Sequence, residues 1–200
     1  MRLPDVCAIQ TGYTARSRLD PAAGGVLAIQ LRDIATDGRI DAEHLTRVDL
    51  GHIGDRYFVR SGDVLFRSRG DHNTASALDE RFAEPAVAVL PLMVLRANRS
   101  LVTPEYLAWA INQPEAQRQF DVAARGTSIR MVPKSSLDDL EIDLPDLETQ
   151  RRIVMTDELA AREATLMRLL ADRKRDLTNR LLAESARRTL PSNLSKRTGT

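Results

Sequence analysis

Cysteine, histidine and aromatic residues are scarce in this sequence of 200 residues, and it has no long hydrophobic run. The single cysteine, Cys7, excludes an internal disulfide and a zinc site built from cysteines alone. The three histidines, His44, His52 and His72, show no metal-ligand spacing. No run approaches the roughly 18 apolar residues of a membrane span, and the first twenty residues lack a signal peptide's apolar core. We therefore expect a soluble, cytoplasmic protein without a structural metal or a membrane partner.

Catalytic motifs are missing as well. The sequence contains no Walker A loop and no Gly-x-Gly-x-x-Gly motif, and its short glycine pairs are typical of plain turns. Cys7 lies between Val6 and Ala8, a context that suits a small buried hydrophobe better than a nucleophile. Many acidic residues adjoin arginines, as on a solvated surface. These observations indicate that the chain has no self-sufficient active site.

Neither sign of charge dominates, because 29 basic residues stand against 28 acidic ones. A net charge of +1 excludes a uniform field that would draw the chain to nucleic acid or an anionic membrane, so any polyanion must meet a local patch. Only three basic residues are lysine, and the other 26 are arginine. This bias suits bidentate recognition of phosphate and guanine, although a GC-rich genome would also produce it.

The sequence changes character at Pro145. Residues 1–145 carry 17 basic and 20 acidic side chains, whereas residues 146–188 carry 10 and 8 with almost no glycine, proline or aromatic residue. We predict a folded domain over 1–145, one long helix over 146–188 and a flexible tail over 189–200.

The N-terminal part mixes strand and helix signals. Helices are predicted from Thr103, which can cap a helix with Pro104 at its first position, and from Asn112 to near Phe120. This pattern predicts an α+β fold with a mixed or mainly antiparallel sheet plus helices, followed by the long helix. Short apolar runs between turn residues, together with one alternating run, predict strands over residues 26–31, 57–59, 64–66, 86–95 and 140–144.

The long helix carries an apolar stripe. About 40 residues at about 1.5 Å each give roughly 60 Å, more than the width of such a domain, so the stripe should extend beyond the domain and pair with a partner helix. The alternative is a helix folded back on its own sheet. The stripe consists of Met155, Leu159, Leu166, Leu170, Leu177 and Leu181.

Two arginine-bearing loops are candidates for nucleic-acid contact: residues 67–74, directly after a strand, and residues 125–134. Each sets a glycine and hydroxyl residues between guanidinium groups, which suits phosphate and base-edge contacts, although polar surface loops have similar compositions. The candidate residues are Arg67, Arg69, Asn73, Arg125, Thr127, Ser128, Arg130 and Lys134.

Residues 140–153 resemble the strand-to-helix signature that ends a target-recognition domain in the specificity (S) subunits of type I restriction-modification enzymes. The resemblance covers about residues 10–180. Two positions depart from the family pattern, Asp146 where a second proline is frequent and Thr149 where an acid is frequent. Other matching segments follow in the family's order: Gly12-Tyr13-Thr14, Ser61-Gly62-Asp63-Val64-Leu65-Phe66, Tyr106-Leu107-Ala108-Trp109-Ala110-Ile111-Asn112 and Ala124-Arg125-Gly126-Thr127-Ser128.

The resemblance implies that residues 1–145 recognise double-stranded DNA, with Tyr13 and Thr14 added to the contacts. It implies that the helix over 146–188 docks a methyltransferase (M) subunit, with or without a restriction (R) subunit. S-adenosylmethionine would belong to that partner, so the chain would need no cofactor and would not be an enzyme itself. S subunits typically carry two recognition domains and two long helices, whereas this chain has the length for one of each. The stripe would then pair with a second copy or with another S fragment.

Two further interpretations remain open at this stage. The globular domain could bind protein rather than DNA, which would make the chain a coiled-coil adaptor. An autonomous hydrolase has the least support, because no catalytic constellation is visible in the sequence.

Overall fold

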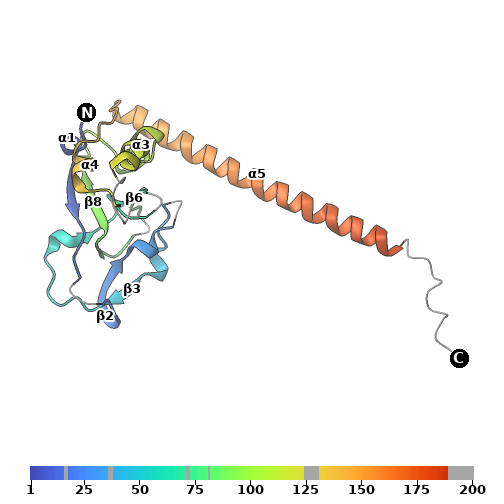
Figure 1. Cartoon of the computed structure of the whole chain (residues 1–200), viewed down its shortest axis with the longest axis horizontal. Helices are drawn as coiled ribbons and strands as arrows, with labels where there is room; N and C mark the ends of the chain where they lie inside the picture. Colours follow the sequence, from blue (N-terminus) through green and yellow to red (C-terminus); the bar gives the residue numbers. More distant parts are fainter. Residues whose placement is uncertain (16–17, 36–37, 71–72, 81, 124–130, 189–200) are drawn as a thin grey trace. The chain divides into compact units, whose positions relative to one another are not determined.

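The structure is a computed structural model that describes residues 1–15, 18–35, 38–70, 73–80, 82–123 and 131–188 (Figure 1). The predicted tail over 189–200 and the predicted contacts Arg125, Thr127, Ser128 and Arg130 lie outside these residues. The chain forms two compact units, Met1–Val154 and Met155–Thr200.

The first sheet of the N-terminal unit is antiparallel throughout. Its strand order is β1-β8-β5-β6, so β8 and β5 are the central strands. The bounds are β1 Cys7–Thr11, β5 Asp63–Arg67, β6 Ala75–Ala77 and β8 Leu92–Ala97.

The second sheet is mixed, in the order β3-β2-β7-β4, because β2 and β7 run parallel while the other neighbours are antiparallel. The expected α+β fold is therefore confirmed, with two sheets in place of the single sheet expected. The predicted strand over 86–95 was wrong in one respect: a turn at Leu90-Pro91 divides it between the two sheets. The bounds are β2 Pro21–Ile29, β3 Thr46–Val48, β4 Phe58–Val59 and β7 Ala86–Ala88.

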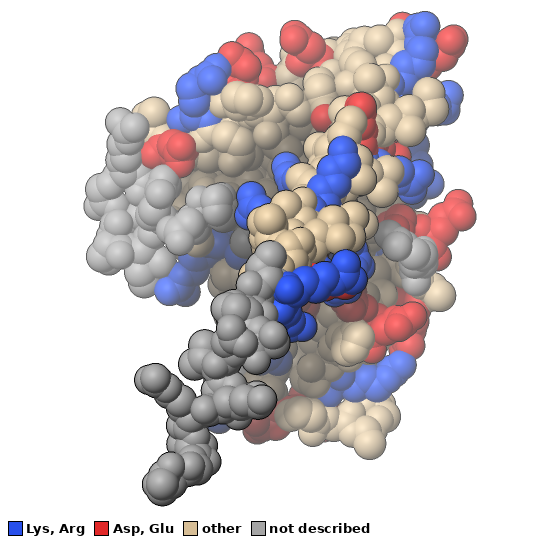
Figure 2. Space-filling view, turned by 90° about the vertical axis from the view of Figure 1, so that its right-hand side faces the viewer, with Lys and Arg blue, Asp and Glu red and all other residues tan. Residues whose placement is uncertain are grey.

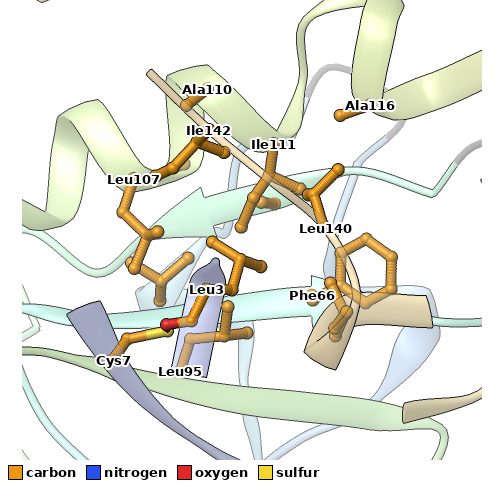
Figure 3. Close-up of a cluster of buried hydrophobic side chains, with 14 of the residues drawn as sticks. Leu3, Cys7, Phe66, Leu95, Leu107, Ala110, Ile111, Ala116, Leu140 and Ile142 are labelled. Carbon is orange, nitrogen blue, oxygen red and sulfur yellow. The ribbon is translucent and has the colours of Figure 1, made fainter. Parts of the chain in front are cut away.

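The first sheet is buried on both faces, so the unit has three layers. Phe66 of β5 and Leu95 of β8 point to one cluster with the helices (Figure 3). Leu65 and Val94, their neighbours along the same strands, belong to a second cluster shared with β2, β4 and β7. Because successive residues of a strand face opposite sides, these apolar runs without alternation are what a central layer requires.

Short helices cover the first sheet. Thr103 caps α2 through its hydroxyl, which accepts a hydrogen bond from Tyr106 N at 3.2 Å, as predicted. Helix α3 extends beyond the predicted end at Phe120. The bounds are α1 Leu3–Val6, α2 Pro104–Ile111, α3 Pro114–Ala123 and α4 Lys134–Asp138, with 3-10 turns η1 Leu31–Asp33, η2 Ala42–His44 and η3 Asp55–Tyr57.

The strand predicted over 140–144 does not form. Its alternation is present, since Leu140 and Ile142 are buried while Glu141 and Asp143 are exposed. Its partner is only the N-terminal end of the chain, through an isolated bridge between Arg2 and Glu141. Only residues 1–3 lie beside this segment, and they lead directly into α1. They are too few to form a strand partner.

Helix α5 runs unbroken over Leu147–Arg188 (Figure 1), which confirms the predicted long helix. Its first two turns belong to the N-terminal unit, where Ile153 and Val154 pack against the core cluster. From Met155 to Arg188 every residue is exposed in the single chain. Among the described residues, no helix is long and apolar enough to span a membrane.

Candidate nucleic-acid interface

The first sheet has one end at which three of the predicted DNA-contacting segments meet. The antiparallel register places the last residues of β1 and β5 at the end where β6 and β8 begin. Tyr13 and Thr14 follow β1, residues 67–74 include the link from β5 to β6, and residues 131–134 approach the same link. We name this region the loop end of the first sheet.

Backbone hydrogen bonds join these segments in a continuous series. Leu90 N donates to Tyr13 O at 2.9 Å, and the next residue, Pro91, accepts at its carbonyl from Ser68 N at 3.3 Å. Ser68 O in turn accepts from Val132 N at 2.7 Å, beside an antiparallel bridge between Arg69 and Met131. Residues 68–69 and 131–132, about 60 positions apart in the sequence, are thus held side by side.

Two glycines permit this arrangement. A Cβ on Gly12 would lie 2.8 Å from both Ala88 O and Leu92 O, so no larger residue fits where β1 leaves the sheet. Gly70 has a φ of +114°, which L side chains rarely adopt, and it follows Arg69 directly. Glycine at both positions therefore shapes the backbone that presents the candidate side chains.

Thr14 and Arg69 are exposed at the loop end, and Tyr13 is half-buried. The backbone of Tyr13 is hydrogen-bonded at both its amide and its carbonyl. Tyr13 N donates to Ala88 O at 2.7 Å, and Tyr13 O accepts from Leu90 N. The hydrogen-bonded backbone therefore holds these residues in place, while their side chains are exposed or half-buried at the surface. This is the geometry expected of residues that contact a macromolecule.

Arg67 and Asn73 are engaged inside the protein. The Arg67 guanidinium donates to Ile34 O at 2.8 Å and to Ala35 O at 3.3 Å. Asn73 is 7% exposed, and its amide nitrogen donates to Arg67 O at 3.0 Å. In this structure the two side chains brace the loops, and the DNA contacts assigned to them stay predictions.

Lys134 begins helix α4 and pairs with Asp138 one turn later, with Nζ to carboxylate distances of 2.6 and 2.8 Å. The pair is partly buried, and Asp138 neutralises the charge of Lys134, which was predicted from the sequence to contact phosphate. Of the arginines in the two loops that the structure describes, Arg69 is exposed and Arg67 is half-buried.

Sequence reasoning missed a cationic and aromatic cluster beside Tyr13. The Tyr13 and Tyr57 rings meet edge to face with centroids 5.3 Å apart. The Arg56 guanidinium carbon lies 4.7 Å from the Tyr57 centroid, and Arg56 is exposed. The adjacency of Arg56 and Tyr57 in the sequence was the available signal, but only the fold brings Tyr13 to them.

Cys7 is buried, as its apolar sequence context predicted. Burial, with a smaller contribution from the charge of Asp138, raises the pKa of the thiol to about 12. A thiol with this pKa stays protonated at neutral pH and is a poor nucleophile. Among the described residues, no group of three or more His, Cys, Asp or Glu side chains could hold a metal ion.

Charge on one face of the molecule is mixed (Figure 2). On the face shown in Figure 2, Lys and Arg side chains lie among Asp and Glu side chains rather than in one block. This agrees with the near-neutral balance of the sequence. Recognition of a polyanion would accordingly depend on a few placed groups rather than on a broad positive field.

Comparison with solved structures identifies the fold. The HsdS subunit from Thermoanaerobacter tengcongensis matches with a TM-score of 0.72 and 24% identity, over 99% of this chain and 50% of that one. A chain from a structure of complex assembly and conformational transition in the type I R-M system matches with a TM-score of 0.62 and 22% identity, over 89% and 42%. The type I restriction-modification S subunit from M. genitalium matches with a TM-score of 0.52 and 14% identity, over 84% and 41%.

These matches show that the chain shares its fold with chains from type I restriction-modification systems. More narrowly, its fold is that of the HsdS specificity subunits. The chain spans half or less of the length of these three chains. No family model matches the sequence, and no curated protein matches it.

The structure also explains the two departures from the S-subunit pattern. The Asp146 carboxylate accepts hydrogen bonds from Thr149 N at 2.9 Å and from Thr149 Oγ1 at 2.8 Å. Asp146 therefore caps α5, and Thr149 is the residue it caps. The two departures complement each other and leave the helix start at Leu147.

Proposed function

We propose that this chain is the DNA-recognition subunit of a type I-like restriction-modification system and directs a methyltransferase to a bipartite DNA site. The observation that carries the proposal is the convergence of Tyr13, Arg69 and Met131 at the loop end of the first sheet. The sequence singled out these segments separately, and the fold joins them. The HsdS fold supports the same conclusion.

The loop end offers two kinds of contact to DNA. Arg69 carries a planar guanidinium that can grip guanine O6 and N7, and Thr14 carries a hydroxyl suited to phosphate. Arg56, Tyr57 and Tyr13 add a cation and aromatic surface beside them. Arg67 and Asn73 hold the loops in place, while Arg125, Thr127, Ser128 and Arg130 stay predicted contacts.

A single recognition domain reads only a half-site, so a bipartite site needs two. The chain spans half the length of the HsdS subunit it matches. In this proposal the second domain belongs to a second copy or to another S fragment, and α5 makes the connection. The methyltransferase supplies S-adenosylmethionine and the methyl transfer, and this chain performs no catalysis.

The test is DNA binding by the full chain in complex with its methyltransferase partner, followed over a range of salt concentrations. Duplexes carry either the motif found methylated in the host or a scrambled control. We expect Arg69→Ala to weaken binding to the motif by about 1–3 kcal/mol. Arg60→Ala is the matched control, because Arg60 is exposed and lies just before β5, at the opposite end of that strand.

Loss of discrimination at one base pair would assign Arg69 to a base edge, whereas uniform loss with a shallower salt dependence would assign it to phosphate. Equal effects of Arg69→Ala and Arg60→Ala would contradict the assigned interface. A complex that copurifies with the methyltransferase but shows no preference for any duplex would favour the adaptor interpretation instead.

A further inference from the structure

The turn η3 presents a cation beside two aromatic rings. Arg56 is exposed, and its guanidinium carbon lies 4.7 Å from the centroid of the Tyr57 ring. The same guanidinium donates a hydrogen bond to the Tyr57 hydroxyl at 2.8 Å. The Tyr13 ring meets the Tyr57 ring edge to face, with centroids 5.3 Å apart. We name Arg56, Tyr57 and Tyr13 the arginine–tyrosine site, and Tyr13 places it beside the loop end of the first sheet.

The turn that carries this site is fixed by Arg96 of β8. Arg96 Nη2 donates to Arg56 O at 2.8 Å and to Phe58 O at 3.0 Å, the carbonyl groups on either side of Tyr57. Arg96 Nη1 donates to Gln10 Oε1 at 3.0 Å, and Gln10 Nε2 donates to Arg56 O at 3.0 Å. The backbone on both sides of Tyr57 is therefore held by side chains of the first sheet.

The register of the first sheet explains why Arg96 reaches this turn. Val94 belongs to the cluster shared with the second sheet, and Arg96 lies two positions further along β8, so both face that sheet. Gln10 pairs with Val94 and Asp63 with Arg96, so they share the same face. Asp63 Oδ1 lies 3.6 Å from Arg96 Nε and compensates its charge.

This network gives Arg96 an internal role. Its guanidinium is engaged by two carbonyl groups, an amide oxygen and a carboxylate. A satisfied polar network specifies one arrangement of the elements that it joins. What it specifies here is the place of η3 beside Tyr13, and Arg56 is the cation that η3 exposes.

The arginine–tyrosine site suits a phosphate of the DNA backbone. The Tyr57 hydroxyl accepts from Arg56, so its own proton can be donated to an external acceptor. The Arg56 guanidinium has five N–H donors, and the bond to Tyr57 uses one of them. One charged donor and one neutral donor side by side match the oxygens of a phosphodiester.

Two further features favour a DNA phosphate over a base edge or a free anion. The Arg56 guanidinium lies against the Tyr57 ring rather than projecting from the turn, as a side chain that reads bases in a groove must. Asp55, the preceding residue, is exposed, and its carboxylate opposes the binding of a small anion. The site therefore gains most of its binding as one part of a larger interface.

We propose that Arg56 and Tyr57 bind a backbone phosphate next to the bases contacted at the loop end, and that Arg96 is the positioning residue of this site. The inference rests on the proposed function, because it takes DNA as the ligand of the loop end. It assigns affinity that does not depend on DNA sequence to η3, outside both arginine loops.

DNA binding by the full chain in complex with its methyltransferase, over a range of salt concentrations, tests the phosphate contact. We expect Arg56→Ala to weaken binding to the methylated motif and to a scrambled duplex alike, by about tenfold. The slope of log K against log salt should fall by about 1. Arg60→Ala, at an exposed arginine before β5, should change neither quantity. Lost discrimination at one base pair, or an effect no larger than that of Arg60→Ala, would overturn the contact.

Duplexes with single methylphosphonate substitutions locate the phosphate. Each substitution removes the charge of one phosphate and leaves the bases unchanged. We expect one position at which it weakens binding of the parent complex but not of the Arg56→Ala complex, in which the contact is already lost. A scan in which both complexes respond identically at every position would contradict the proposal.

Arg96→Gln tests the positioning role. We expect it to abolish the response to the same methylphosphonate, and Arg56→Ala/Arg96→Gln should bind no more weakly than Arg56→Ala alone, because Arg96 acts through Arg56. A role in stability alone would leave the response in place and make the two losses additive. Gln10→Ala removes one donor to Arg56 O and is the milder variant if Arg96→Gln does not fold.

The two proposals fail separately. Sequence-specific binding by the parent complex, with unchanged binding by Arg56→Ala, would overturn this inference and keep the proposed function. A parent complex that binds all duplexes equally, with a salt slope that Arg56→Ala lowers, would keep the phosphate contact and overturn sequence recognition.

Discussion

Gln150 is the side chain that ties the start of α5 to the N-terminal unit. It is fully buried, and its Oε1 accepts from Thr103 N at 2.9 Å. Its Nε2 donates to Leu101 O at 2.9 Å and to Pro145 O at 2.8 Å. One amide group thus links the cap of α2, the loop before it and the residue two positions before α5.

Replacing Gln150 with alanine should therefore destabilise the N-terminal unit. Three backbone groups would lose their partner, and a buried polar group left unpaired costs about 1–3 kcal/mol. Urea unfolding monitored by circular dichroism measures the loss. Gln119→Ala, at an exposed glutamine of α3, should change stability by less than about 0.5 kcal/mol. Equal midpoints for the two variants would show that the Gln150 network contributes nothing.

The Asp146 cap makes the start of α5 sensitive to acid. Hydrogen bonds from Thr149 N and Oγ1 hold the pKa of the Asp146 carboxyl below its ordinary value. A lowered pKa means that the cap stabilises α5 fully above the ordinary value and is lost as the pH falls through the lower one. We expect faster hydrogen exchange at the first turn of α5 as the pH falls below about 4, after correction for the intrinsic rate. Asp146→Asn keeps an acceptor that does not titrate, so its exchange should lack this step.

The apolar stripe of α5 predicts which substitutions would dissociate an assembly formed through this helix. The double substitution Leu166→Asp/Leu170→Asp places charges at the centre of the stripe, where burial of an unpaired carboxylate against a partner is strongly unfavourable. We expect a monomeric mass in analytical ultracentrifugation. Ala164→Asp/Ala171→Asp, on the opposite face of the same helix, adds the same charge and should leave the mass unchanged. Identical masses for the two variants would remove the stripe from the interface.

The sequence predicted elements whose pattern depends only on local geometry. Helix α5 has a sustained period, and α2 has a hydroxyl cap and an N-terminal proline. The turn within residues 86–95 could not be predicted, because strands buried on both faces give a continuous apolar run in which a turn leaves no break. Residues 140–144 carry a strand's alternation without a strand's partner, and no local pattern reveals the length of a partner.

The candidate site shows the same limit. The composition of the arginine loops marked them separately, but their junction depends on Ser68, whose backbone pairs with Pro91 and Val132. Such bonds leave no trace in residue type. The internal roles of Arg67 and Asn73 were likewise invisible, because an arginine that donates to carbonyl groups looks the same in a sequence as one that contacts DNA.

For the whole molecule, one recognition domain used twice about a twofold axis must read the same half-site on opposite strands. The methylated site should therefore be an inverted repeat whose halves flank a spacer of fixed length. Methylome sequencing of cells that hold this chain and its methyltransferase as the sole S component measures the motif. A continuous motif would contradict a two-domain complex, and an asymmetric bipartite motif would require a second, different S fragment.

The junction at the loop end of the first sheet is made by main-chain groups: Leu90 with Tyr13, Pro91 with Ser68, and Ser68 with Val132. Such bonds do not involve the exposed side chains of Thr14 and Arg69. Mutation can therefore exchange the outward-facing residues of the two loops while the scaffold beneath them stays folded. Under the proposed function, this separation means that point substitutions can give new DNA specificities while the domain stays folded.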